Sequence, residues 1–402
     1  MTSTTMSVAG TRPALTLERA TFGLLLAFVA SLQVSIAAAN ILLTGLLLGW
    51  AALLVRDRAR PAAPAFLVPL LAYAAWTLVA TLFSFNFTVS LIDDKQLVLL
   101  LIVPAVYQVA RGERASTVID VVVSVGAASA AFGIVQYGIL HYDNLGQRPQ
   151  GALTHYMTYS GVLMLVLCAA TARLIFSSRD RTWPALVMPA LVVALALTFT
   201  RSAWVGACAG VALLFALKNF RLVGLLPIIV ALIFALAPDS ITARMASVFS
   251  LQDPTNRDRV AMMRTGVAII EAEPLTGIGP DMVPRMYAEY RDASAVNTTN
   301  PHLHNVPLQI AAERGLPALA IWIWFVVAAM TALWRLCRNG SEPVLAAGAL
   351  AALTAMLAAG FFEYNFGDSE FLMLLLVLLT LPFAARNTPD ANASTGAAAA
   401  PR

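Results

Sequence analysis

Two histidines separated by one residue stand near the end of this very apolar chain, in the stretch NPHLHNVPLQIAAERGLPALA (Asn300–Ala320). They are His302 and His304, two of only four histidines in the sequence. A neutral imidazole is a ready proton acceptor near neutral pH, and it is also a common metal ligand. The residues alone leave three interpretations open: a general base, part of a metal site, or a pair of solvated side chains.

A metal ion would need ligands beyond the two histidines. Side chains two residues apart converge only on an extended segment, and a zinc site takes three or four protein ligands. Nearby carboxylates include Asp281, Asp292 and Glu313, and they show no ligand spacing. We therefore expect no metal and no other cofactor.

Arginine is the basic residue that accompanies the histidines. Arg201 interrupts the apolar stretch LALTFTRSAWVG (Leu195–Gly206). An ionisable group at membrane depth is costly and usually functional, although a group near the interface can also extend to water. The stretch 256–314 of a long loop adds six more arginines and no lysine: Arg257, Arg259, Arg264, Arg285, Arg291 and Arg314. Because the planar guanidinium suits phosphate oxygens, this group indicates a phosphate- or diphosphate-bearing ligand; the alternative is a face that contacts water or lipid headgroups.

A third polar group lies earlier, in YDNLGQRPQGALTHYMTYSG (Tyr142–Gly161). Arg148, His155 and Tyr156 are candidates to line a cavity, against the simpler interpretation of an ordinary loop at the membrane interface. The sequence contains no glycine-rich phosphate loop, zincin helix or serine nucleophile elbow.

The elements that must position these residues are membrane helices. The chain has 402 residues, of which 59% are hydrophobic and 12% charged, and a soluble domain carries roughly twice that charged fraction. We predict an all-α, polytopic membrane protein surrounded by lipid, with no nucleic-acid partner. Twelve apolar segments are each close to the length that crosses a bilayer. They lie near 19–35, 38–55, 65–84, 92–110, 117–138, 156–176, 183–199, 203–217, 222–237, 316–334, 344–361 and 370–385.

Arginine and lysine residues also predict the orientation. Every second break between the apolar segments is basic, so we expect both termini in the cytoplasm. The predicted organisation is a nine-helix membrane region (1–237), an external loop with short amphipathic helices (238–315), a three-helix membrane region (316–386) and a disordered cytoplasmic tail (387–402). Thr21–Ile36 followed by Ala37–Ala39 also resembles a signal peptide with its cleavage site, but the next apolar run follows at once, which favours a first transmembrane helix.

The long external loop is expected to be structured and to lie on the membrane surface. Asn256–Pro274 places apolar residues at helical spacing and predicts an amphipathic helix. Asn305 is a good N-cap for a second helix that begins near Pro307 and stops at Gly315. Charged residues are absent from the middle of the apolar segments, which argues against a transporter or channel.

These motifs, in this order, resemble the O-antigen ligase/polymerase superfamily, and within it most closely the O-antigen ligases. The resemblance rests on His302-Leu303-His304-Asn305, Leu308-Gln309 and Glu313-Arg314-Gly315-Leu316, on an Arg259-led helix that closes in Pro274-Leu275-Thr276-Gly277-Ile278-Gly279, and on Thr200-Arg201-Ser202-Ala203-Trp204. It covers roughly residues 195–316. Met263 stands where the family often has tryptophan.

The resemblance implies a glycosyltransferase of GT-C architecture in the bacterial inner membrane, with its active site facing the periplasm. The donor would be a glycan on undecaprenyl diphosphate, and the acceptor lipid A–core oligosaccharide. His304 would be the general base, with Arg201 and Arg259 holding the diphosphate in place of a metal. The expected supporting residues are His302, Asn305, Arg264, Arg314, Glu313, Arg148 and His155.

Two alternatives remain. An O-antigen polymerase of the same superfamily uses the same donor with a second lipid-linked glycan as acceptor, but tends to have two sizeable external loops, whereas this chain has one. The other alternative is a transporter of lipid-linked glycans.

Overall fold

The chain folds into a bundle of α-helices. The computed structural model describes residues 13–178, 181–247, 250, 252–340 and 342–387, and these residues contain no β-strand. The predicted tail is outside the described residues, apart from position 387. The helices are α1 (Pro13–Ser31), α2 (Ile36–Asp57), α3 (Leu67–Leu82), α4 (Phe87–Asp93), α5 (Ile102–Val109), α6 (Arg114–Gly138), α7 (Tyr156–Phe176), α8 (Thr182–Leu197), α9 (Arg201–Lys218), α10 (Leu225–Leu236), α11 (Asp239–Ala246), α12 (Pro254–Ala272), α13 (Val283–Tyr290), α14 (Val306–Arg338), α15 (Pro343–Gly360) and α16 (Ser369–Arg386).

Seven of the described helices are long and apolar enough to cross a membrane, namely α2, α6, α7, α9, α14, α15 and α16. Shorter apolar helices cover Leu67–Leu82, Thr182–Leu197 and Phe220–Leu236. The protein is therefore a helical, multi-pass membrane protein, and twelve crossings stay a prediction. The segment predicted near 92–110 is not one α-helix: a 3-10 helix, η1 (Asp94–Leu101), precedes α5. Pro104, which has no N–H to donate, lies in the first turn of α5, where a proline is tolerated.

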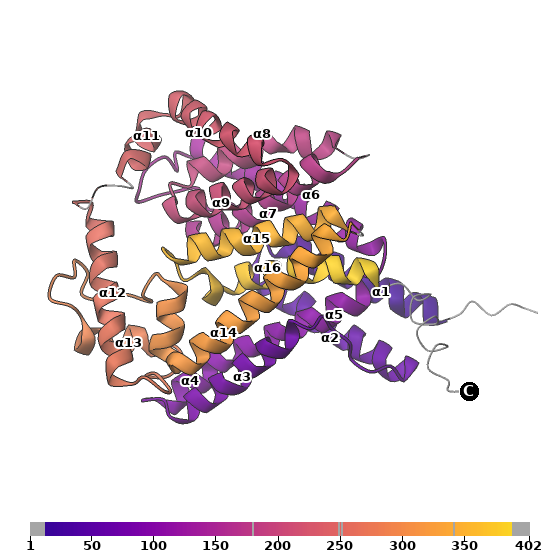
Figure 1. Cartoon of the computed structure of the whole chain (residues 1–402), viewed down its shortest axis with the longest axis horizontal. Helices are drawn as coiled ribbons and strands as arrows, with labels where there is room; N and C mark the ends of the chain where they lie inside the picture. Colours follow the sequence, from indigo (N-terminus) through magenta and orange to yellow (C-terminus); the bar gives the residue numbers. More distant parts are fainter. Residues whose placement is uncertain (1–12, 179–180, 248–249, 251, 341, 388–402) are drawn as a thin grey trace, which may run out of the picture.

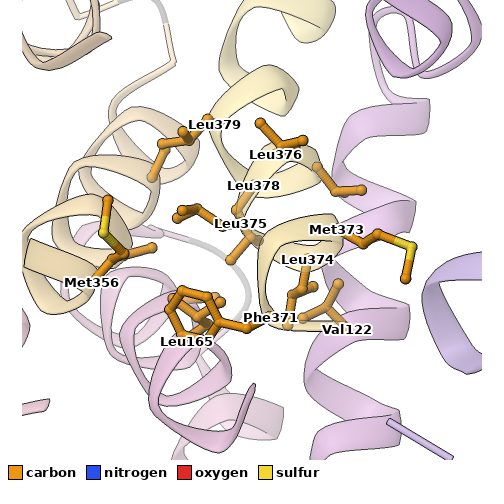
Figure 2. Packing of buried hydrophobic residues seen from close by; sticks show 14 of the residues in the cluster. Val122, Leu165, Met356, Phe371, Met373, Leu374, Leu375, Leu376, Leu378 and Leu379 are labelled. Carbon is orange, nitrogen blue, oxygen red and sulfur yellow. The ribbon is translucent and has the colours of Figure 1, made fainter. Parts of the chain in front are cut away.

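Helices α7, α15 and α16 form the centre of the bundle. Each is apolar on all sides, as expected of a helix that is enclosed by others, and most of each one is buried. Figure 2 shows Phe371 and Leu375 of α16 packed among side chains that include Leu165 of α7 and Met356 of α15. Because α15 and α16 are held on both flanks, the short turn 361–368 between them is fixed relative to the bundle.

The predicted external loop forms its own layer at one end of the bundle. Helices α11, α12 and α13 lie at the left of Figure 1, beyond the ends of the central helices. Helix α12 (Pro254–Ala272) begins and ends within two residues of the predicted amphipathic helix Asn256–Pro274. Its buried residues include Asp258, Met262 and Ile269, which face the protein, whereas Val260 and Met263 are exposed. The apolar spacing in the sequence therefore marks an outward-facing stripe.

Helix α14 joins this layer to the membrane part. Asn305 is its N-cap and accepts a hydrogen bond from the Leu308 N–H at 2.9 Å, as predicted. Gly315 interrupts the helix with φ 79° and ψ 169°, so the first section runs from Val306 to Arg314 and confirms the predicted stop. A Cβ at Gly315 would lie 1.9 Å from the Leu275 carbonyl oxygen, so only glycine fits this crossing of two backbones.

Candidate functional site

His302 and His304 meet at one carboxylate, which comes from the turn between α15 and α16. Nδ1 of His304 lies 2.9 Å from Oε2 of Glu363, and Nε2 of His302 lies 3.4 Å from Oε1 of the same side chain. The two imidazole rings are 4.1 Å apart, centroid to centroid. All three side chains are partly buried. The arrangement is a pair of histidines that share a carboxylate.

The hydrogen bonds give the two histidines different chemical roles. Nδ1 of His302 accepts the His304 backbone N–H at 3.3 Å, so its proton belongs on Nε2, which faces Glu363. Both nitrogens of His302 are thus engaged. His304 uses Nδ1–H to donate to Glu363, which leaves Nε2 with its lone pair. His304 is therefore the imidazole that has a basic nitrogen available.

The backbone holds His304 in an unusual conformation. Its φ is 49°, in the left-handed region that few residues other than glycine adopt. The neighbours fix the turn on both sides, since Leu303 N–H donates to Oε1 of Gln309 at 2.7 Å and Asn305 caps α14. A conformation kept at such a cost, held by several hydrogen bonds, is typical of functional sites.

The charges in this group follow from burial and from close partners. Burial lowers the pKa of His302 to about 4, so this imidazole is neutral near pH 7. Burial tends to raise the pKa of Glu363, but the charges and hydrogen bond of His304, with His302 and Arg259, outweigh it and bring the pKa to about 2. Glu363 is therefore ionised at neutral pH, and a carboxylate beside an imidazole stabilises the protonated form of that ring.

Arg201 begins α9 and is almost completely buried. Its Nη1 donates to the carbonyl and hydroxyl of Ser247 at 2.9 and 3.0 Å. Its Nη2 donates to Oδ1 of Asp253 at 3.2 Å and to Oδ1 of Asn256 at 3.0 Å. This arginine therefore ties the first turn of a membrane helix to the layer that contains α11, α12 and α13.

Three more arginines, Arg259, Arg244 and Arg148, lie close enough to Arg201 for its charge to affect their pKa values. Burial lowers the pKa of Arg259, with a further contribution from the charge of Arg201, while Glu363 acts in the opposite sense. The Nε of Arg259 is buried without a hydrogen-bond partner among the described residues. Burial and the charges of Arg201 and Arg148 lower the pKa of Arg244 to about 10. The cations outnumber the carboxylates Asp253 and Glu363, so this region attracts anions.

A cavity of about 200 Å³ lies between the histidine group and the start of α9. Its lining includes His302 and Glu363, the residues on both sides of Arg201 (Thr200 and Ser202), and His155. His155 also caps α7, where its Nδ1 accepts the Met157 N–H at 3.3 Å. The cavity thus lies between His302 and the two residues that flank Arg201, whereas neither His304 nor Arg201 lines it.

The structure brings Arg148 to this region, where its guanidinium lies 4.2 Å from the centre of the Tyr156 ring. Arg264 is exposed on α12, with Nη1 3.6 Å from Oδ1 of Asp292 on the surface. Arg314 is buried elsewhere, with Nη1 2.9 Å from Oε2 of Glu313 and Nη2 3.2 Å from Oδ2 of Asp93. No arginine is among the described residues that line the cavity, and Arg264 and Arg314 are also paired with carboxylates outside the arginine group around Arg201.

Glu313 has a local role that the structure makes visible. Its Oε1 accepts the Val283 N–H at 3.4 Å, and the backbone N–H groups of Ile278 and Gly279 donate to the carbonyls of Ala312 and Glu313 at 3.0 Å each. The end of the first section of α14 is thus satisfied by the loop that follows α12. This contact couples the helix that carries Arg259 to the helix that follows His304.

Sequence reasoning missed Glu363, Arg244 and Asp253. Glu363 is the third side chain of a group that has the ligand atoms for a metal ion, with His302 and His304, and these atoms lie within 4.8 Å of one another. Its neighbours Phe361, Phe362 and Tyr364 form no recognisable motif. The one available signal was an acidic residue in a short turn between two very apolar helices.

Residues 185–323 match the family model described as O-antigen ligase. This match, which covers about a third of the chain, supports membership of the O-antigen ligase/polymerase superfamily. The comparison with curated proteins gives no match. Members of this superfamily are glycosyltransferase-like enzymes that act on lipid-linked glycans. The matched segment contains Arg201, Arg259 and both histidines, whereas Glu363 lies 40 residues beyond its end (363 − 323).

Proposed function

We propose that this protein is an O-antigen ligase of the bacterial inner membrane. It transfers a glycan from undecaprenyl diphosphate to lipid A–core oligosaccharide on the periplasmic face, with inversion and without a metal ion, on a GT-C architecture. The observation that carries the proposal is the hydrogen bond between His304 and Glu363 beside a group of partly uncompensated arginines. This transfer requires a base and a group that stabilises a departing anion.

The chemistry is a direct displacement. His304 Nε2 takes the proton of the acceptor hydroxyl as that oxygen attacks the anomeric carbon of the donor sugar, and Glu363 stabilises the imidazolium that results. The bond from the anomeric carbon to the diphosphate oxygen breaks. Arg201 and Arg259, with Arg244 and Arg148 nearby, stabilise the charge of the departing diphosphate. Because the diphosphate leaves as a stabilised anion, no enzyme nucleophile is needed.

An apolar groove next to the arginines supports a polyprenyl donor. It measures about 370 Å³ and lies among α7, α8, α9, α10 and α11. Its lining is Leu167, Thr171, Leu174, Ile175, Met188, Val192, Leu195, Ala196, Trp204, Ala207, Cys208, Val211, Phe215, Leu226, Ile229, Val230, Ile233, Ile241 and Met245. Met245 follows Arg244 in α11, so a lipid tail in the groove brings its diphosphate to the arginine group.

A transfer assay tests this function. Purified protein, donor and acceptor are combined in detergent with EDTA, and the product is resolved by its size. We expect transfer by the wild type, none by His304→Ala or Arg201→Ala at normal expression, and intermediate transfer by His302→Ala. Wild-type transfer by His304→Ala would end the general-base proposal, and activity that depends on added divalent ion would end the metal-free one.

The single long external segment between α10 and α14 favours a ligase over a polymerase. A deletion strain separates the two. A ligase deletion removes all long glycan from lipopolysaccharide while the lipid-linked polymer is still made. A strain that retains a single attached repeat unit identifies a polymerase instead.

A further inference from the structure

We propose that His302, His304 and Glu363 bind a divalent transition-metal ion such as Zn²⁺, and that the bound ion switches glycan transfer off. The regulatory half of this inference rests on the proposed function, because it assumes that His304 is the base. The binding half rests on geometry alone. The site would be an inhibitory one, separate from any requirement for metal in the reaction.

The ligand set and its dimensions fit zinc. Two imidazoles and one carboxylate, with water in a fourth position, are a common set for this ion. Ligand atoms about 2.0–2.2 Å from one ion at tetrahedral angles lie about 3.3 Å from each other. Here the nitrogen–oxygen separations are 2.9 Å from His304 to Oε2 of Glu363 and 3.4 Å from His302 to Oε1, and one ligand atom from each of the three residues can be chosen so that all lie within 4.8 Å of one another. Small side-chain rotations therefore suffice to bring all three to a single ion.

The surroundings allow the ion to enter. His302 and Glu363 line the cavity beside α9, so an ion can reach them, and water can occupy the fourth position. Glu363, His304 and His302 keep 12%, 16% and 24% of their side-chain surface exposed, respectively. The nearby arginines oppose any cation. We therefore expect selectivity for ions that gain strongly from imidazole nitrogen, such as Zn²⁺, Ni²⁺ or Cu²⁺, over Mg²⁺ and Ca²⁺.

Metal binding would change which nitrogen of each histidine carries the proton. Coordination by Nδ1 of His304 requires the proton of that neutral ring to move to Nε2, which removes the lone pair that would accept the acceptor's proton. Coordination by Nε2 of His302 moves its proton to Nδ1, at the cost of the long hydrogen bond from the His304 backbone N–H. Each imidazole keeps one proton, so the exchange through water balances. Inhibition follows from the change in His304.

The binding test needs no substrate. The purified chain competes with a fluorescent zinc chelator, and thermal unfolding is followed with and without Zn²⁺. We expect Glu363→Gln and His302→Ala each to weaken zinc binding by about tenfold or more and to reduce the zinc-dependent rise in Tm. His141→Asn is the matched control, because His141 lies outside the group at φ 59°, which asparagine tolerates, and this variant should bind zinc like the wild type.

The inhibition test uses the transfer assay. Zn²⁺ should stop the wild type and His141→Asn at concentrations that saturate the binding curve, EDTA should restore transfer, and Mg²⁺ should have no effect. If Glu363→Gln and His302→Ala bind zinc like the wild type, the proposed metal site is wrong. If the zinc-saturated wild type transfers glycan at its full rate, the proposed inhibition is wrong. A chain that binds zinc through these residues yet transfers no glycan in EDTA keeps the metal site and removes the proposed function instead.

Discussion

Asp253 lies between two arginines of the candidate diphosphate site. Its Oδ1 is 3.2 Å from Nη2 of Arg201, and its Oδ2 is 3.5 Å from Nη1 of Arg244. The two guanidiniums and neighbouring groups hold the pKa of Asp253 below its usual value in spite of the opposing effect of burial. An internal carboxylate thus occupies guanidinium groups that, in the proposed function, would bind the phosphate oxygens of the donor.

Asp253→Asn should therefore strengthen donor binding. The change removes the competing charge, while asparagine still caps α12 and Arg201 keeps its bonds to Ser247 and Asn256. We expect the KM for donor to fall about fivefold, on the order of 1 kcal/mol, in steady-state assays. An unchanged or higher KM would show that Asp253 positions Arg201 for binding and does not compete with the donor.

Glu363→Gln should lower the rate of transfer while leaving donor binding intact. Glutamine still accepts a hydrogen bond from His304, but it lacks the charge that stabilises the imidazolium. We expect kcat to fall about 10²-fold with the donor KM nearly unchanged, and a smaller loss for Glu363→Asp, which keeps the charge. Steady-state kinetics with thermal unfolding checks this, and a smaller loss for Gln than for Asp would indicate a role in shape and not in charge.

Two arginines on α12 offer a matched comparison. Arg259 is partly buried near Arg201 and Glu363, whereas the side chain of Arg264 is 62% exposed. Arg259→Lys keeps the charge but loses the planar fork, and we expect kcat/KM to fall at least about tenfold. Arg264→Lys should remain within about twofold of the wild type. Similar losses for the two variants would contradict a specific diphosphate contact by Arg259.

Arg314→Ala should act mainly on stability. Removing it leaves the buried carboxylates of Glu313 and Asp93 without their cation, a change that costs about 3–5 kcal/mol in comparable buried pairs. We expect a large drop in Tm in detergent and low expression. The double variant Arg314→Met with Asp93→Asn should recover part of this loss. A normal Tm with a raised donor KM would instead support the diphosphate contact predicted from the sequence.

Local sequence signals predicted the local structure well. Asn305 caps α14 and Gly315 interrupts it because capping and left-handed backbone depend on neighbouring residues. The periodicity of α12 predicted its helix, but it did not reveal that Val260 and Met263 face outward while Asp258 faces the protein. Periodicity gives the faces of a helix, and the partners of each face come from tertiary packing.

The composition of the site was harder to predict. The histidines and Arg201 stood out by type and place, but Glu363 is 59 residues from His304 and meets it only through the packing of α15 and α16. Residue type alone also grouped Arg314 with the diphosphate contacts, whereas two carboxylates surround it in the structure. Distance along the chain hides such partners until the helices are arranged in space.

The position of Glu363 has a consequence for the synthesis of the protein. The arginines and histidines of the site are synthesised before Glu363, because they precede it in the sequence. Glu363 lies in the turn that α15 and α16 hold in place. A nascent chain that has been synthesised only as far as α14 would therefore contain His304 without Glu363. Under the proposed function, we expect full transfer activity only after the final hairpin has inserted, so a partly translated chain would consume little lipid-linked glycan.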